Sequence, residues 1–301
     1  MVNTRILDAE FGYLAPTALD EALDILNSKN KVKVLAGGTD LIVHIKVGAE
    51  VEMDYMLDIK RIEELDYVQL REHCCDLDEV CCIGANAKLS RIEKEAVIVE
   101  RYPALAKALS LMASISVRNM GTMAGNICNA SPVADSVIPA ICYGARIKLK
   151  SADGERVLPL EDFFVAPGVS VIKPNELLTN IALPKPKPHT GASFIKKTRV
   201  RPDVAKISVG VVIERDGDKV ANCRIAMGAI AATPAYLKSI GDSIVGKTMS
   251  EQLIKETAAA AARTIKPIDD NRTTAEYRTA IAEILTADAL AEAWKNAGGE
   301  L

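Results

Sequence analysis

The chain has 301 residues, of which 49% are hydrophobic and 26% charged, a composition that supports about two or three domains with buried cores. Its net charge of −3 disfavours nucleic acid and anionic membranes as partners, and we expect neither an N-terminal leader nor a membrane span. Because seven cysteines in such a chain indicate reduced thiols, we expect a cytoplasmic protein.

The N-terminal segment predicts a small α/β unit. Apolar residues at helical spacing predict a helix over Leu19–Leu26, capped by Thr17. A short strand, Lys31–Val34, leads into the turn Leu35-Ala36-Gly37-Gly38-Thr39-Asp40-Leu41, and a helical pattern and a second strand, Tyr55–Ile59, follow. Strand, glycine turn and helix in this order favour a phosphate site, because the turn offers free amides. The three spaced glycines of a dinucleotide fingerprint are absent, and a plain structural turn remains an alternative.

A hairpin with two cysteine pairs comes next. We expect its arms at Val68–Arg71 and Val80–Ile83, around a turn at Asp76–Glu79. Cys74-Cys75 and Cys81-Cys82 lie on or beside these arms. Zinc ligands usually come as spaced pairs, and adjacent strand residues point to opposite faces. Small apolar packing is therefore favoured over a metal site.

The organising stretch of the chain is Ser116–Asp135, which we predict to be a polar loop. It follows a predicted helix, Tyr102–Met112, and precedes an apolar run. Glycines here let backbone amides approach an anion or a flat ring. A cofactor loop is favoured over a tight structural turn, since small and hydrogen-bonding residues concentrate in it: Gly121, Thr122, Gly125, Asn126, Asn129, Ser131 and Asp135.

The second half of the chain predicts further strands, a stiff linker and a helical end. The linker is the proline-rich segment 184–188, a plausible domain boundary. The predicted strands are Ala145–Lys150, Arg156–Pro159, Leu177–Leu183, Ala205–Glu214 and Val220–Ala229, and the predicted helices are Ser250–Thr264 and Thr273–Asn296.

Side-chain catalysis is not indicated. Gly241–Thr248 matches the Walker A expression, but a helix-like segment rather than a buried strand precedes it, so nucleotide hydrolysis is rejected. The three histidines, His44, His73 and His189, lie far apart in the sequence and form no triad or metal set. We therefore predict no catalytic side chain and no metal ligand, and expect a cofactor to carry the chemistry.

Two motifs give the chain a family resemblance. Segment 35–41 together with Arg118-Asn119-Met120-Gly121-Thr122-Met123-Ala124-Gly125-Asn126 and Asn129–Asp135 resembles the FAD-binding (medium) subunits of molybdenum hydroxylases. These are enzymes of the xanthine dehydrogenase, carbon monoxide dehydrogenase and nicotinate dehydrogenase type. The family usually has two adjacent glycines where this chain has Ala124-Gly125.

The resemblance implies an α+β fold: a PCMH-type, two-part FAD-binding fold and a C-terminal domain that pairs a three-stranded antiparallel sheet with helices. The implied boundaries are 1–58, 59–184 and 185–301. Ala36–Asp40 and Thr122–Asn126 would hold the pyrophosphate, and Asp135 would lie near the ribityl chain or ring. The full implied cofactor-binding set is Leu35, Ala36, Gly37, Gly38, Thr39, Asp40, Thr122, Ala124, Gly125, Asn126, Cys128, Asp135, Leu178, Phe194 and Lys196.

The resemblance also implies partners. Electrons would come from a molybdopterin-binding large subunit through the [2Fe–2S] clusters of a small subunit, and would leave FAD for NAD⁺ or another acceptor. The cysteine patterns for such clusters are absent here, so those subunits are expected to be separate chains. A stand-alone flavin oxidoreductase and a flavin-free assembly protein remain as alternatives.

Overall fold

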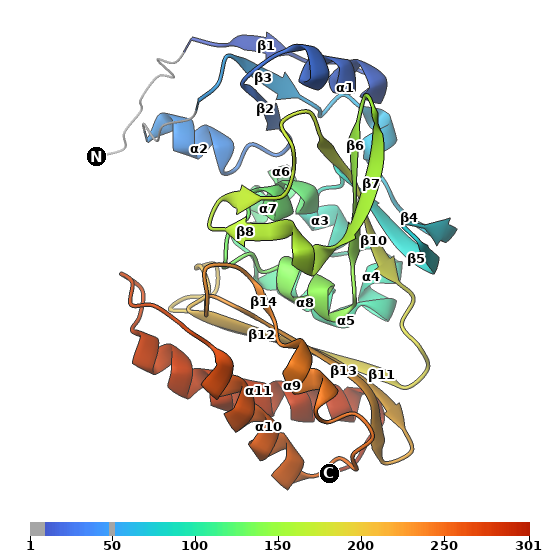
Figure 1. The fold of residues 1–301 in the computed structure, drawn as a ribbon, viewed down its shortest axis with the longest axis vertical. Helices are drawn as coiled ribbons and strands as arrows, with labels where there is room; N and C mark the ends of the chain where they lie inside the picture. The colour runs from blue at the N-terminus through green and yellow to red at the C-terminus, as the bar shows by residue number, and fades with distance from the viewer. Residues whose placement is uncertain (1–9, 48–51) are drawn as a thin grey trace.

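The computed structural model describes residues 10–47 and 52–301 and stacks three units along its long axis (Figure 1). The expectation of a missing leader rests in part on residues 1–9, which lie outside the described residues. Within the described ranges no helix is both long and apolar enough to cross a membrane. A large hydrophobic core extends from Leu23 in the N-terminal unit, through the central unit, to Phe194 at the edge of the C-terminal unit.

The N-terminal unit has a three-stranded sheet in the order β1-β3-β2, whose neighbouring strands run parallel. Helix α1 buries Leu19, Ala22, Leu23 and Leu26, the apolar face predicted from spacing. The predicted cap by Thr17 is wrong. The helix starts after Ala18, and the Leu19 amide donates instead to Glu64 Oε1 at 3.0 Å. The elements are β1 (Gly12–Leu14), α1 (Leu19–Ser28), β2 (Val32–Leu35), α2 (Leu41–Lys46) and β3 (Tyr55–Asp58).

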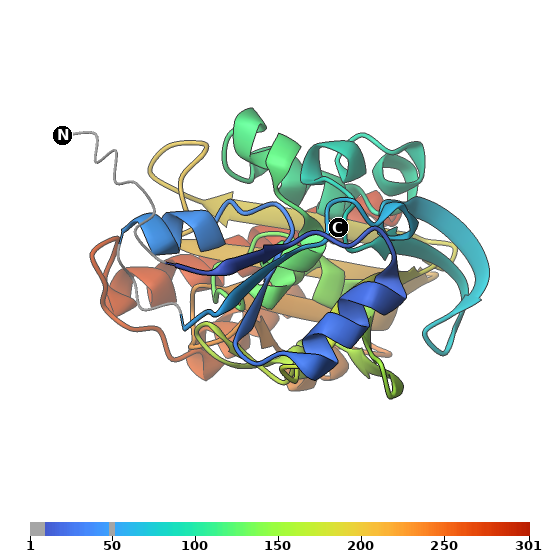
Figure 2. The ribbon, with the colours of Figure 1, turned by 90° about the horizontal axis from the view of Figure 1, so that it is seen from above.

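The central unit is built on an antiparallel sheet in the order β4-β5-β10-β6-β7. Its β4–β5 hairpin turns at Cys75-Asp76 rather than at Asp76–Glu79 as predicted, because Cys74 still pairs with Leu77. Viewed from above, this hairpin projects to one side and curls (Figure 2). The strands and short 3-10 helices are η1 (Glu63–Leu65), β4 (Val68–Cys74), β5 (Leu77–Gly84), β6 (Arg146–Ser151), β7 (Gly154–Pro159), η2 (Leu160–Phe163), β8 (Phe164–Ala166), β9 (Val169–Ser170) and β10 (Leu177–Pro184).

Short helices fill the rest of the central unit and correct the prediction for the organising stretch. That stretch is not a loop throughout, since it contains most of α6 and all of α7. Ser114 and Thr122 cap these helices by accepting from Val117 N and Gly125 N. The caps let two short helices form one directly after the other along the chain. The helices are α3 (Leu89–Ile92), α4 (Ala96–Arg101), α5 (Pro103–Leu111), α6 (Ile115–Met120), α7 (Met123–Cys128) and α8 (Val137–Cys142).

The C-terminal unit pairs an antiparallel sheet, β11-β12-β13-β14, with helices. Three long strands match the expected three-stranded sheet, and β14 adds a two-residue fourth strand. Helices α10 and α11 lie along the sheet, and Ser250 and Thr274 cap them. The elements are β11 (Thr190–Lys197), β12 (Ile207–Asp216), β13 (Lys219–Gly228), β14 (Ala235–Tyr236), α9 (Lys238–Asp242), α10 (Glu251–Thr264) and α11 (Ala275–Asn296).

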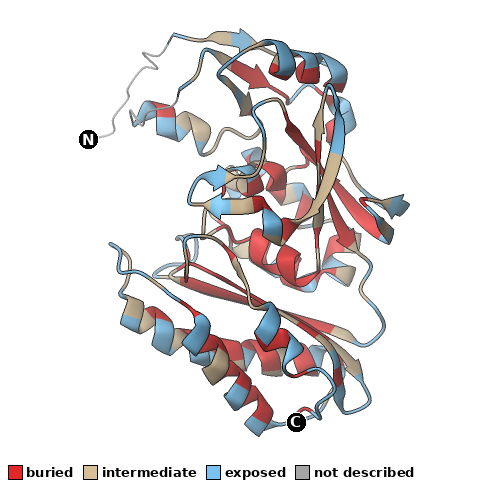
Figure 3. Cartoon of the chain, in the orientation of Figure 1, coloured by how far each residue is buried: buried red, intermediate tan, exposed pale blue. Residues whose placement is uncertain are grey.

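Helix α8 joins the central and C-terminal units and is buried along its whole length (Figure 3). A Cβ on Gly210 would lie 3.0 Å from Ile138 Cγ2, so glycine at this position lets α8 pack closely against β12. Gly241, the first glycine of the Walker-like string, has a similar packing role. Its absent Cβ would lie 2.2 Å from the carbonyl oxygen of Cys223, which explains this glycine without a phosphate.

Candidate cofactor site

The two glycine turns that the sequence singles out meet in space. A Cβ on Gly37 would lie 2.5 Å from the Met120 carbonyl oxygen and 2.6 Å from the Gly121 Cα. The segments are therefore in backbone contact, which any side chain on Gly37 would break. We call residues 36–40 and 120–126 the loop junction.

The first half of the loop junction offers unpaired backbone donors. In the part of the chain that the structure describes, the amides of residues 37–40 donate no hydrogen bond to another protein group, whereas the carbonyls of Gly38 and Asp40 accept from Ile42 and His44. Gly38 has a φ of 74°, which favours glycine and turns the chain sharply. Successive free amides in such a turn form a concave site suited to an anion.

The second half is held by its own hydrogen bonds. Thr122 Oγ1 accepts from the Gly125 amide at 3.0 Å, and Asn126 Oδ1 accepts from Ser136 Oγ at 2.8 Å. The Ala124 residue is 4% exposed and belongs to the hydrophobic core, so the methyl group that replaces a family glycine is accommodated by packing. A Cβ on Gly125 would lie 3.9 Å from Ala36 Cβ, so this glycine faces the other half of the junction.

A buried ion pair lies next to the loop junction in sequence and links the central unit to β11. Lys196 Nζ donates to Asp135 Oδ2 at 2.7 Å, and Leu111 O accepts from the same ammonium at 3.3 Å. Both side chains are less than a tenth exposed. Burial raises the pKa of Asp135 to about 6, although the charge of Lys196 opposes this shift. Asp135 Oδ1 is buried and accepts no hydrogen bond from the described residues, so an acceptor remains for a ligand donor.

The remaining predicted residues differ in what they can reach. Leu178 and Phe194 are 1% and 0% exposed inside the main core, and their predicted contact with the cofactor stays a prediction. Leu35 lies beneath Gly38, with its Cδ1 at 2.9 Å from the Cβ that Gly38 lacks. Cys128 ends α7 and is exposed. The structure thus brings the two glycine-rich segments into contact and pairs Asp135 with Lys196, while Leu178 and Phe194 lie in the main core.

The sequence analysis missed the residue that holds α6 in place. Arg118 Nε donates to Glu93 Oε2 at 2.8 Å, and its Nη1 donates to the Met112 and Ala113 carbonyls at 2.9 and 3.2 Å. The guanidinium is largely buried and fixes the chain that enters the loop junction. No local spacing relates Arg118 to Glu93, because the two lie on separate helical segments.

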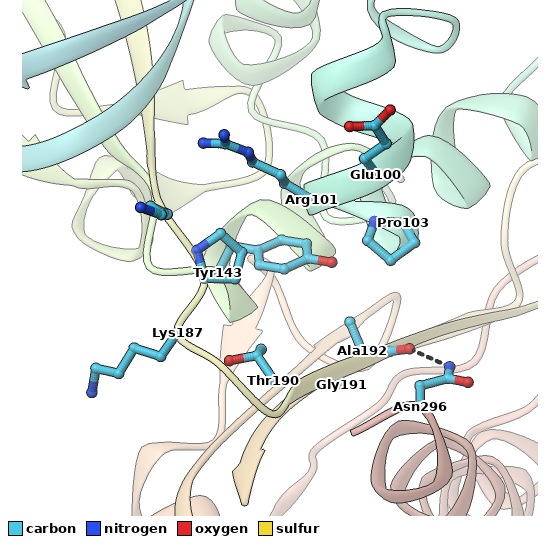
Figure 4. Close-up of a pocket in the computed structure, with 11 residues that line it drawn as sticks. Glu100, Arg101, Pro103, Tyr143, Lys187, Thr190, Gly191, Ala192 and Asn296 are labelled. Atoms are coloured by element: carbon cyan, nitrogen blue, oxygen red, sulfur yellow. Dashed lines mark hydrogen bonds between the residues drawn. The ribbon is translucent and has the colours of Figure 1, made fainter. Parts of the chain in front are cut away.

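A cavity in the described residues lies away from the loop junction. It has a volume of about 550 Å³ and lies between the α4–α5 corner, the β10–β11 linker and the end of α11, with Arg101, Tyr143 and Thr190 among its lining residues (Figure 4). A hydrogen bond from Asn296 Nδ2 to the Ala192 carbonyl, 2.9 Å long, closes one side. None of the predicted cofactor residues lines this cavity.

Comparisons with known proteins identify the class. Residues 9–186 match the model of the FAD-binding domain in molybdopterin dehydrogenases, and residues 192–293 match that of the CO dehydrogenase flavoprotein C-terminal domain. The fold resembles that of a chain in carbon monoxide dehydrogenase from Hydrogenophaga pseudoflava, with a TM-score of 0.90, 29% identity, and coverage of 97% of this chain and 99% of that one. These findings define a flavoprotein with the two-part FAD-binding fold, which confirms the expected fold class.

The family of the chain follows from its sequence relatives. The chain is 31% identical to the glyceraldehyde dehydrogenase medium chain of Sulfolobus acidocaldarius, over 94% of this chain and 98% of the relative. It is 26% identical to the xanthine dehydrogenase FAD-binding subunit of Escherichia coli O157:H7, over 96% and 98% of the two chains. The chain therefore belongs to the family of FAD-binding subunits of molybdenum hydroxylases, as the motifs predicted, and its cofactor is FAD.

The described residues fit such a cofactor. The free amides of the loop junction suit a pyrophosphate, and the unpartnered Asp135 Oδ1 suits a hydroxyl or ring N–H donor. Among the described residues no group of three or more histidine, cysteine, aspartate or glutamate side chains is placed to hold a metal ion.

Proposed function

We propose that the chain binds FAD at the loop junction and serves as the electron-transfer subunit of a molybdopterin-dependent hydroxylase or dehydrogenase. The observation that carries this proposal is the backbone contact of Gly37 with Met120 and Gly121, because it joins two otherwise separate turns into one site. In this proposal residues 36–40 and 122–126 hold the pyrophosphate, and the chain divides at residues 58 and 184. The finer choice of a xanthine dehydrogenase-like enzyme is part of the same proposal.

The roles of the protein groups follow from their contacts. Amides of residues 37–40 bind an anionic group, and Thr122 caps the first turn of α7, which contains Gly125. Ser136 orients the Asn126 side chain, and Lys196 holds Asp135 with one oxygen left to accept a hydrogen bond. FAD, when bound, supplies the redox chemistry of the subunit.

Partner subunits are required by this proposal. We propose a large subunit with molybdopterin and a small subunit with two [2Fe–2S] clusters as the electron source, and NAD⁺ or another carrier as the acceptor. Support comes from the relatives named as medium chains and FAD-binding subunits. All seven cysteines are free thiols, which agrees with the cytoplasmic location we propose.

Two measurements test the proposal. The chain, purified without added flavin, should show the two visible absorption bands of oxidised flavin, and the bound nucleotide released by denaturation should be FAD. A colourless folded chain that takes up no FAD would favour the assembly-protein alternative. Native mass spectrometry of material from source cells should give a complex with the two partner subunits. A lone flavinylated chain with its own turnover would favour the stand-alone oxidoreductase.

A further inference from the structure

Three cysteine sulfurs of the β4–β5 hairpin converge on the side chain of Asn180, in a cluster that the proposed function does not use. Asn180 Nδ2 lies 3.3 Å from both Cys74 Sγ and Cys75 Sγ and 3.7 Å from Cys82 Sγ. Cys74 Sγ and Cys75 Sγ are 3.5 Å apart. Asn180 in turn accepts from Tyr67 at 2.9 Å, which fixes its amide toward the sulfurs.

This arrangement differs from ordinary apolar packing. Asn180 is 3% exposed, and a buried amide needs hydrogen-bond partners. Its NH₂ group faces only sulfurs, which are weak acceptors as thiols. A metal does not account for the cluster, because no three ligand side chains in the described residues are placed to hold one.

The three cysteines differ in their exposure to solvent. Cys74 is partly exposed at the end of β4, whereas Cys75 and Cys82 are buried. Cys81, the neighbour of Cys82, points to the opposite face and belongs to the main core. An oxidant that reaches the hairpin from solvent therefore meets Cys74 first, with the Cys75 sulfur directly behind it.

We propose that Cys74 and Cys75 form a reversible two-electron thiol site that a hydroperoxide oxidises to a disulfide. Cys74 Sγ attacks one peroxide oxygen, the O–O bond breaks, and with hydrogen peroxide the products are a sulfenic acid at Cys74 and water. Cys75 Sγ then attacks the Cys74 sulfur, an S–S bond forms, and the sulfenic oxygen leaves as a second water. Two thiols and one hydrogen peroxide give one disulfide and two waters.

The disulfide should be easy to reduce. Adjacent Cα atoms across a trans peptide are about 3.8 Å apart, shorter than the span of roughly 4.4–6.8 Å in ordinary disulfides. Such a bond stores strain and has a more oxidising potential than a structural disulfide. Cys75 also has a φ of 55°, so the hairpin tip already holds a non-glycine residue in the left-handed region. The bond should therefore reverse with a thiol reductant.

Mass spectrometry of the full-length chain tests this proposal. The reduced protein is treated with hydrogen peroxide, unreacted thiols are alkylated, and trypsin and then Asp-N are applied. Trypsin releases residues 72–88, and cleavage before Asp76 and Asp78 separates Cys74-Cys75 from Cys81-Cys82. We expect the fragment that ends at Cys75 to lose two hydrogens and both alkyl groups, and dithiothreitol to restore alkylation. Cys81 and Cys82, on the other fragment, should remain alkylated.

Variants sharpen the assignment. Cys74→Ser should abolish the loss of hydrogens and leave Cys75 alkylated, while Cys81→Ser, a matched change on the other face, should leave the reaction unchanged. Circular dichroism confirms that each variant is folded. A cross-link between the two fragments would overturn the choice of Cys74 with Cys75, and four alkylated cysteines after peroxide would overturn the site itself.

Discussion

Two aspartate–cation pairs in this chain shift the pKa of their carboxyl groups in opposite directions. In the C-terminal unit, Asp270 accepts from Arg278 at 2.8 Å and from the amides of Arg272 and Thr273 at 2.8 and 3.1 Å. Burial opposes ionisation there, but these donors hold the pKa of Asp270 at about 2. Asp135 has one cation and an unpartnered oxygen, and burial raises its pKa to about 6.

The hydrogen bonds of the two pairs indicate which one serves stability alone. Arg278 uses its planar fork to bond the Lys206 and Ile268 carbonyls as well as Asp270, so every charge and dipole is compensated. In the Asp135–Lys196 pair, Asp135 Oδ1 is buried without a hydrogen-bond donor, so the free-energy cost of removing this oxygen from water is not offset in the ligand-free chain. We interpret the first pair as a structural clamp and the second as a site prepared for a ligand.

The largest expected effect comes from breaking the clamp. Arg278→Ala should lower the free energy of unfolding by about 2–4 kcal/mol, because the buried guanidinium loses its hydrogen bonds to a carboxylate and two carbonyls. Arg272→Ala is the control, since Arg272 contacts the same carboxylate only at 3.7 Å and is more exposed; its cost should be about 0–1 kcal/mol. Urea unfolding measures both. Equal losses in the two variants would contradict the clamp.

The loop junction should be the next most sensitive point. Gly37→Ala places a methyl against two backbone atoms, which should cost about 1–3 kcal/mol of stability and most of the bound FAD. Gly12→Ala is a control in the same unit, because its Cβ would lie 2.7 Å from a Tyr55 ring atom and far from residue 120 in the sequence. We expect a similar loss of stability there with normal flavin content. Full flavin content in folded Gly37→Ala would separate the turns from the cofactor.

The two aspartates should make the free energy of unfolding depend on pH in opposite directions. The raised pKa of Asp135 means that its neutral form is favoured on folding. Its contribution is therefore full below about pH 4 and is lost as pH rises through about 6. Between pH 7 and pH 5 the ligand-free chain should gain about 1 kcal/mol relative to Asp135→Asn. The lowered pKa of Asp270 acts oppositely, because its stabilisation is present above about pH 4 and is lost toward pH 2. Unfolding midpoints across this range that move in parallel for wild type and variant would refute the assignment to Asp135.

Local sequence patterns predicted the elements but not the long-range side-chain pairs. The buried face of α1 and the two glycine-rich segments follow from spacing and residue type within short windows. Thr122 was recognised as polar, but its role as a helix cap required the backbone that follows it. Arg118 with Glu93 could not be found, because only the packing of separate helices brings them together. The same holds for Asn180 and the hairpin sulfurs, which are about a hundred residues apart in the sequence.

The pairing of Asp135 with Lys196 is a partial exception. Both residues were singled out, but separately and through a family resemblance, and their contact appears only once β11 packs against the central unit. Phe194 was singled out from the same strand, yet its side chain lies in the core. Phe194 and Lys196 are two positions apart and share one face of β11, so the strand pattern alone does not distinguish the side chain that packs in the core from the one that pairs with Asp135.

The smallest expected effect concerns the flavin potential. Replacing Asp135 by Asn removes one negative charge beside the proposed ribityl or ring position, which should favour added electron density on the bound flavin. Because Lys196 already offsets part of that charge, we expect a change on the order of 1 kcal/mol, or an increase of roughly 20 mV in the two-electron midpoint. The increase should be present at pH 8, where Asp135 is ionised, and should shrink below its pKa of about 6, where the wild-type carboxyl is neutral as well.

Spectroelectrochemical titration of both proteins at pH 8 and below this pKa measures the change in midpoint. Asp270→Asn, in the C-terminal clamp, is the control that should leave the midpoint unchanged. An identical midpoint in fully flavinylated wild type and Asp135→Asn at pH 8 would place Asp135 outside the electrostatic environment of the flavin and make its pair with Lys196 a structural clamp like the one at Arg278.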